Sequence, residues 1–282
     1  MARRCGFTLV EIVVALALAL IVIGAIHRLL VATQRLSRAQ AAQMDLQSNV
    51  RASALVIANE LRELNGVDMG SADQTDVLSI TGSGMMYRAA RGIGFLCEAP
   101  VAGRLRIARN SFSGYRDPQP SRDGAYLYVG EIPDAGVADS WIPLPIAGVA
   151  TNTSCPGMGG PAISITTSSS AAIAGVPVGT PLRIYETMEL RLYQSEGQWW
   201  LGARSVGAGE AIQPVAGPFA GSDGLRLEYL NRAGVPTADP AAIKSVIVTV
   251  HGITEEPVAA AGGKRLEEEL LTQVTLRNAM RR

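Results

Sequence analysis

The stretch GFTLVEIVVALALALIVIGAI (Gly6–Ile26) decides the fold of this chain of 282 residues. Residues 12–26 are continuously apolar, and as a helix the stretch spans about 30 Å, the thickness of the hydrocarbon core of a bilayer. The small-residue cleavage site that ends a secretory signal peptide does not follow it. The stretch is therefore predicted to remain as a single-pass membrane anchor. One carboxylate, Glu11, interrupts it, although an anchor does not need an acid.

The helical pattern continues beyond the apolar stretch. Neither Gly nor Pro occurs between Ala25 and Asn65, and Asn65-Gly66 is a typical helix stop. Apolar residues recur at helical spacings along one face, namely Leu46, Val50, Ala54, Ile57, Leu61 and Leu64. The sequence predicts one helix from about Phe7 to Leu64, apolar all round in its first half. The stripe on its second half should pack on a folded domain.

The N-terminal segment resembles the processing site of type IV pilin-like prepilins. A short basic leader precedes GFTLVE at residues 6–11, and the apolar span follows at once. The class includes minor pilins, pseudopilins of type II secretion and competence pseudopilins. The resemblance implies that a membrane-embedded prepilin peptidase cuts between Gly6 and Phe7 and methylates the new amino terminus.

The resemblance covers residues 1–65 and weakens beyond them. The segment after the span (DLQSNVRASALVIANELREL), the pair GLRLEYLN and IKSVIVTV, and the closing VTLRN are similar to W-type minor pilins and J-type minor pseudopilins. Residues 66–180 resemble no family, so their fold stays open.

The resemblance gives Glu11 a role. Cleavage leaves a cationic amine on Phe7, four residues earlier on the helix, where the two groups can pair within one chain. Between chains, Glu11 can meet the amine of a neighbouring subunit in a bundle of low dielectric constant, where charge pairing is strong. Glu11 would then set the register of stacked helices. The alternative is a stray acid at the membrane edge.

After Gly66 the pattern changes from helical to alternating. Strands are predicted at residues 76–81, 104–109, 125–131, 162–166, 182–194, 199–204, 224–231, 243–252 and 266–278. SEGQ between the fifth and sixth of these predicts a hairpin. Turn-rich stretches lie between the earlier strands, at residues 82–94, 113–124 and 151–161.

These patterns predict an α+β fold in which a long N-terminal helix packs on an antiparallel sheet with loop-rich insertions, as in pilins. We expect four parts along the chain. They are a prepilin leader at 1–6, the transmembrane half of the helix at 7–28, its amphipathic half at 29–65 and an exported strand-rich domain at 66–282.

Three cysteines bear on the compartment. Cys5 lies in the predicted leader, so the exported domain retains Cys97 and Cys155. Two thiols in an oxidising compartment can form a disulfide, and a bond closing this loop would be worth about 4 kcal/mol. The alternative is two separate buried thiols.

Composition and motifs argue against several other functions. The formal net charge is zero, so there is no basic field for nucleic acid. The only histidines, His27 and His251, are far apart in the sequence and have no zinc-site spacing, and phosphate-binding, calcium-binding and nucleophile-elbow motifs are missing. We therefore expect no enzymatic activity, no metal and no cofactor. A Ser-His-Asp triad, whose members need not be adjacent, is the open alternative.

The first functional hypothesis is a minor pilin or pseudopilin that initiates or caps a type IV pilus-like filament. Its partners would be prepilin peptidase, other pilins or pseudopilins bound through the N-terminal helix, and inner-membrane lipid before assembly. The chain would lie in a bacterial inner membrane, with its C-terminal domain exported to the periplasm or to a surface filament. Pilus, type II secretion and competence systems are not distinguished.

The second hypothesis is a filament-tip binding module for adhesion, DNA or a secretion substrate, carried on a pilin helix. The predicted loops 82–94 and 111–124 hold Arg88, Arg91, Arg116 and Arg122, which could meet an anionic partner. Solvated loop arginines are the simpler interpretation. A third alternative is an ordinary single-pass protein with a chance motif.

Overall fold

The computed structural model divides the chain into two compact units. One unit joins Met1–Ser48 with Ile253–Glu268, and the other joins Asn49–Gly252 with Glu269–Arg282. The residues whose structure is described below are 8–65, 75–130, 140–156, 159–168, 173 and 175–277.

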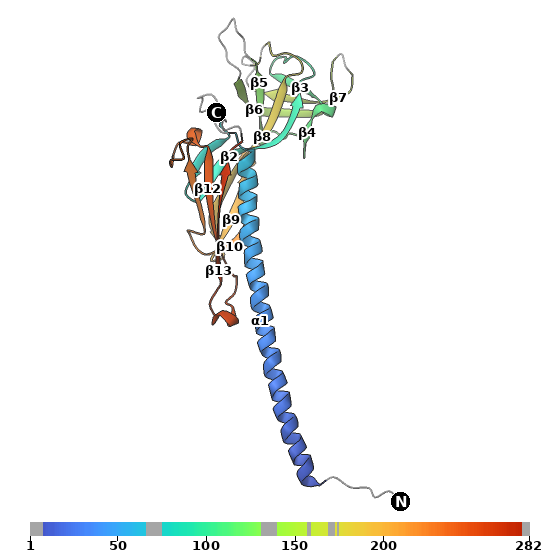
Figure 1. The fold of residues 1–282 in the computed structure, drawn as a ribbon. Helices are drawn as coiled ribbons and strands as arrows, with labels where there is room; N and C mark the ends of the chain where they lie inside the picture. The colour runs from blue at the N-terminus through green and yellow to red at the C-terminus, as the bar shows by residue number, and fades with distance from the viewer. Residues whose placement is uncertain are drawn as a thin grey trace, which may run out of the picture. The chain divides into compact units, whose positions relative to one another are not determined.

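A single helix, α1, runs from Leu9 to Glu63 (Figure 1). This confirms the predicted long helix, except that Phe7 lies outside the described residues. All six residues of the predicted apolar stripe, from Leu46 to Leu64, are buried, while Arg51 and Arg62 are exposed. The amphipathic pattern therefore predicted the packed face of the helix correctly.

Thirteen strands among the described residues belong to one connected sheet, and all their registered ladders are antiparallel. The strands are β1 (Val77–Thr81), β2 (Gly84–Phe95), β3 (Arg104–Ala108), β4 (Ser113–Gly114), β5 (Asp123–Val129), β6 (Ser140–Ser154), β7 (Pro161–Thr167), β8 (Pro181–Ser195), β9 (Gln198–Ser205), β10 (Gln213–Phe219), β11 (Leu225–Leu230), β12 (Ser245–Ile253) and β13 (Glu267–Thr275). The described part of the chain also contains the short 3₁₀ helices η2 (Arg109–Ser111), η5 (Pro240–Ala242) and η6 (Ala259–Ala261). One helix packed on an antiparallel sheet confirms the α+β class.

The long strand β8 is central to the sheet because it pairs with β2, β5 and β9. Its predicted hairpin with β9 is present, with Ser195 opposite Gln198. The two turn residues, Glu196 and Gly197, both have positive φ, as a two-residue turn that follows the strand twist requires. The main path of the sheet runs β11-β12-β10-β9-β8-β5-β6-β7-β3.

The prediction of a turn-rich stretch at residues 82–94 is wrong. Most of this segment forms β2, which pairs with β8 from Gly84 to Phe95. Its glycines reflect close packing rather than turns, because a Cβ at Gly84 would collide with Arg191 and one at Gly94 with Ile107. The stretch 151–161 is also not all turn, since β6 continues to Ser154.

Residues between β2 and β8 build a second layer over the end of the sheet. β6 pairs first with β5 and then with β7, so it passes from one layer to the other. The apolar residues between the layers form one buried core, made of Leu96, Leu105, Ile107, Ala125, Leu127, Leu144, Ile146, Ile163, Ile165, Ile173, Val176, Leu182 and Ile184. This insertion lies within residues 66–180, whose fold the sequence left open.

Candidate functional site on the N-terminal helix

The first turns of α1 form an apolar surface that no described residue covers. The most apolar 18-residue window of the helix has a mean hydropathy of 3.0, and none of it is buried. Large side chains from Leu9 to Leu30 stand exposed around the helix. A helix that is apolar on every side is stable only in lipid or among other helices. By length and composition this helix can cross a membrane.

Glu11 lies at the start of this surface and is held by Thr8. The Thr8 backbone N–H and the Thr8 hydroxyl each donate to Glu11 Oε2, both at 2.9 Å. In return, the Glu11 N–H donates to Thr8 Oγ1 at 3.3 Å. These reciprocal bonds are a capping box, in which residue N3 and the N-cap satisfy each other's backbone donors. The helix therefore begins with a carboxylate already oriented by its own chain.

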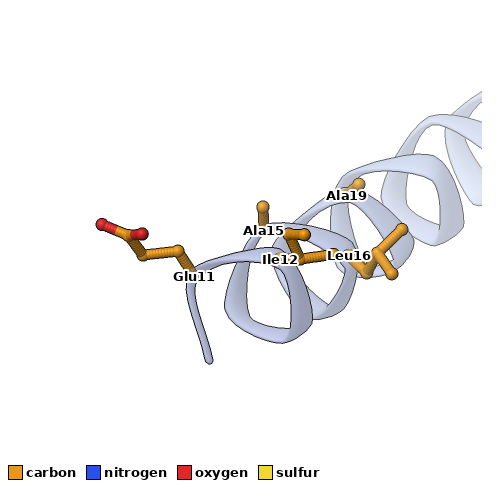
Figure 2. Close-up of a pocket in the computed structure, with 5 residues that line it drawn as sticks. All are labelled: Glu11, Ile12, Ala15, Leu16 and Ala19. Atoms are coloured by element: carbon orange, nitrogen blue, oxygen red, sulfur yellow. The ribbon is translucent and has the colours of Figure 1, made fainter. Parts of the chain in front are cut away.

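The surface next to Glu11 is a shallow apolar face on one side of the helix. It is formed by Glu11, Ile12, Ala15, Leu16 and Ala19, which recur at helical spacings. Figure 2 shows the Glu11 carboxylate directed away from the helix, with the four apolar residues following along it. Ala15 and Ala19 have small side chains, so a second helix can approach this face closely.

The two residues of the predicted cleavage site, Gly6 and Phe7, lie outside the described residues. Sequence reasoning missed the role of Thr8, although the signal was present, because Thr8 and Glu11 have the spacing of a capping box.

The arginines proposed to meet an anionic partner are already engaged within the chain. Glu186, with a side chain only 1% exposed, accepts Arg91 Nε at 2.7 Å and lies 2.6 Å from Arg122 Nε. Arg116 reaches Glu186 at 3.4 Å and binds Asp123 through both Nη atoms, at 2.5 and 2.7 Å. The prediction that these were solvated loop arginines is therefore wrong.

Two further contacts also differ from the prediction of solvated loop arginines. Arg122 also pairs with Glu210 at 2.7 Å, so three arginines face three carboxylates and the cluster is neutral. Arg88 lies on β2, not on a loop, and donates to the Tyr126 hydroxyl at 2.6 Å. Glu186 lies on the same side of β8 as the buried Leu182 and Ile184, and its arginine partners come from distant parts of the sequence.

Hydrogen bonds and nearby positive charges keep the buried Glu186 carboxylate ionised. Burial alone would raise the pKa of Glu186, but hydrogen bonds from Ser205 and Arg91 and the charges of Arg91 and Arg122 outweigh it. The pKa of Glu186 therefore lies below its ordinary value. At neutral pH each of the three arginines already faces a carboxylate of the same chain, so the cluster leaves no cation over for a ligand.

Cys97 and Cys155 are joined in the structure, with their Cα atoms 5.7 Å apart. Both are buried beside Ala162, at the end of the second layer. The bond closes the segment that contains β3 to β6.

Within the described ranges, no group of three or more His, Cys, Asp or Glu side chains could hold a metal ion. His27 lies exposed on α1, and His251 lies on β12.

Comparison with known proteins supports the N-terminal segment alone. Residues 1–26 match the family model described as the prokaryotic N-terminal methylation motif. No curated protein and no solved structure matches the chain. The matched residues include the predicted cleavage site, Glu11 and the apolar span.

Proposed function

Since the methylation motif in residues 1–26 supports a type IV pilin-like prepilin, we propose that the chain is a minor pilin or pseudopilin. In this function it initiates or caps a pilus-like filament and catalyses no reaction. One observation carries the proposal. The exposed apolar half of α1 bears a single oriented carboxylate, Glu11, at the end where a new amino terminus would be made.

The proposal divides the chain by task. Residues 1–6 are the leader, 7–28 cross the inner membrane, 29–65 support the folded domain, and 66–282 form the exported part. The joined pair Cys97 and Cys155 favours an oxidising compartment for that part, such as the periplasm. We propose that this pair is oxidised in the mature protein. A non-reducing gel of the extracted chain, with and without reductant, tests it.

The proposed mechanism is assembly. Prepilin peptidase cuts after Gly6, and the Phe7 amine becomes available. An incoming helix then presents Glu11 to the amine of its neighbour, while the face of Ala15 and Ala19 lets the two helices pack closely. In an apolar bundle an unpaired charge is costly, so the pairing selects one register. The helix exchanges lipid for other helices without changing its conformation.

The alternative of an anion-binding filament tip loses its sequence argument. Arg91, Arg116 and Arg122 are neutralised by acids of the same chain. Arg88, the fourth arginine, donates its described hydrogen bonds to the Tyr126 hydroxyl and the Thr75 carbonyl, both neutral.

The first test determines the amino terminus of the chain extracted from cells that contain a prepilin peptidase. We expect a methylated Phe7 by mass spectrometry. A Gly6→Leu variant should keep Met1, because a side chain at this position blocks close approach of the peptidase to the backbone. An intact Met1 in the unsubstituted chain would refute the proposal.

The second test separates pairing from helix capping. Glu11→Ala removes the carboxylate, whereas Thr8→Ala removes the two bonds of the Thr8 hydroxyl and keeps the carboxylate. We expect both variants to be processed, and only Glu11→Ala to be lost from sheared filaments. Equal loss of both variants would assign Glu11 to capping alone.

A further inference from the structure

One face of the sheet at its insertion end carries exposed apolar side chains, Ile93 and Phe95. Cross-strand partners place Ile93, Arg183, Tyr126 and Pro143 in one row across β2, β8, β5 and β6. Directly opposed residues point to the same side of a sheet. The alternate residues, such as Leu182 and Leu127, belong to the buried core on the other side.

We name this surface the outer aromatic face and define it by Ile93, Phe95, Tyr126, Trp141, Pro143 and Arg183. Its two most exposed large side chains, Ile93 at 40% and Phe95 at 44%, are purely apolar. Both stand on β2, two residues apart and therefore on the same side of the strand. They do not belong to the core, and no described element covers them.

The aromatic rings behind these residues are fixed by arginines. Arg183 lies over the Trp141 ring at 5.6 Å. Arg88 lies 5.5 Å from the Tyr126 ring and 5.4 Å from the Tyr185 ring. Such stacking orders large side chains before any partner arrives, which lowers the entropy cost of binding.

The charge of the face is positive. Arg88 makes its hydrogen bonds to Tyr126 and to the Thr75 carbonyl, both neutral. Arg183 has one described carboxylate nearby, Asp76 at 3.8 Å. Asp76 is buried and already accepts two hydrogen bonds from Asn65. Two arginines therefore share one acid, Asp76.

These features fit a protein partner. Trp, Tyr and Arg are the residues enriched at the energetic centres of protein interfaces, where charged carboxylates and lysines are depleted. Ile93 has no ring to stack on a base or a sugar, so this exposed position fits an apolar protein patch better than a nucleic acid or a glycan. Face-to-face pairing of two copies would bring like charges together and is disfavoured.

We infer that the outer aromatic face is the docking surface for a second, different protein subunit, whose contact patch has an apolar centre and an acidic rim. This inference adds a partner for the folded domain to the proposed function. It does not use the N-terminal motif, so it can fail while the processing of Gly6–Phe7 stands, and the reverse.

The test uses the full-length chain in its native cells, with a photoreactive benzoyl-phenylalanine in place of Ile93. We expect one discrete adduct with a different protein, whose crosslinked peptide maps to an apolar segment flanked by Asp or Glu. The matched control places the same probe at Val235, which is 53% exposed in the turn after β11, and should give no such adduct.

Charge variants complete the test. Arg183→Glu should lower the adduct yield about tenfold or more, whereas Arg183→Lys should retain most of it. Arg226→Glu, on the exposed side of β11, controls for net charge and should have no effect. If Arg183→Glu impairs folding, Pro143→Glu takes its place, again with the probe at position 93. Pro143 is an exposed residue of the same face, so this variant should likewise lower the adduct yield.

Four results would overturn the inference. They are no adduct at position 93, an adduct between two copies of this chain, an adduct to a glycan, nucleic acid or lipid, and a protein adduct that neither Arg183→Glu nor Pro143→Glu weakens.

Discussion

Glu11 and Glu186 are two carboxylates set among apolar residues, and their surroundings differ completely. Glu186 is buried on β8 and has three arginines within ion-pairing distance. Glu11 is exposed on α1, where its described hydrogen-bond partner is the neutral Thr8. The strand domain supplies the counter-charges for its own buried acid. The apolar half of the helix supplies none for Glu11 among the described residues.

This difference separates structural from interfacial charge. A buried acid whose counter-charges come from its own chain stabilises that chain's fold, because removing it leaves the counter-charges unpaired. An acid on an apolar surface without a described counter-charge has no comparable effect on the fold. In the proposed function, its electrostatic partner is the processed terminus of the same chain or of a neighbouring one.

The largest expected effect comes from Glu186→Ala. Three arginines would lose their shared partner, and the free energy of unfolding should fall by about 3–5 kcal/mol. Thermal unfolding of the full chain in detergent measures it. Glu189→Ala is the matched control on the same strand, since its arginine partners are half-exposed and the expected loss is about 0–1 kcal/mol. Equal losses would remove the contrast between a buried and a surface acid.

The stabilising effect of the Glu186 ion pairs should depend on pH. The pKa of Glu186 is lower in the folded chain than its ordinary value of 4.5, so its stabilising effect is present above that value. The effect is lost as the pH falls through the lower, folded pKa. Glu186→Gln should therefore be less stable than the unsubstituted chain at pH 7, and the difference should shrink below pH 4.5. A difference that stays constant with pH would contradict this.

The pKa of Asp76 is shifted in the opposite direction to that of Glu186. Burial outweighs the bonds from Asn65 and the charges of Arg183 and Arg88, and the pKa of Asp76 is raised. Any stability linked to its protonation is present at low pH and is lost as the pH rises through the folded pKa. The comparison of Glu186→Gln with the unsubstituted chain cancels this contribution, because Asp76 is present in both.

A smaller effect is expected where α1 is fixed to the sheet. The Tyr87 hydroxyl donates to Glu60 at 2.9 Å, and burial and the Glu60 charge raise the pKa of Tyr87, so the proton stays in place. Tyr87→Phe should lower the free energy of unfolding by about 1.5–3 kcal/mol. Tyr193→Phe, on β8, removes a hydroxyl with no described partner and should change it by less than about 0.5 kcal/mol. Chemical denaturation of the full chain compares the two.

The smallest effect on stability is expected from Glu11→Ala. The apolar half of the helix is exposed, so removing its acid should leave the unfolding midpoint of the strand domain unchanged while filament assembly is lost. Calorimetry and filament shearing on the same variant measure both. A fall in the midpoint comparable with that of Glu186→Ala would mean that Glu11 supports the fold.

Much of the fold could be predicted because its signals are local. The spacing of Leu46 to Leu64 identified the buried face of α1, and alternation identified β8 and its hairpin with β9. β2 could not be predicted, since its glycines look like turn residues until β8 and Phe112 are placed against them. Local pattern does not distinguish a glycine needed for a turn from one needed for close packing.

The sequence by itself determined the apolar anchor, the position of Glu11 within it and the methylation motif, because all three depend on neighbours along the chain. Only the tertiary structure decided the role of the arginines. Arg91 and Glu186 are 95 positions apart in the sequence, and no local rule pairs them. Ion pairs and sheet faces form between distant segments, so the neutral cluster and the outer aromatic face emerged only once the strands were in register.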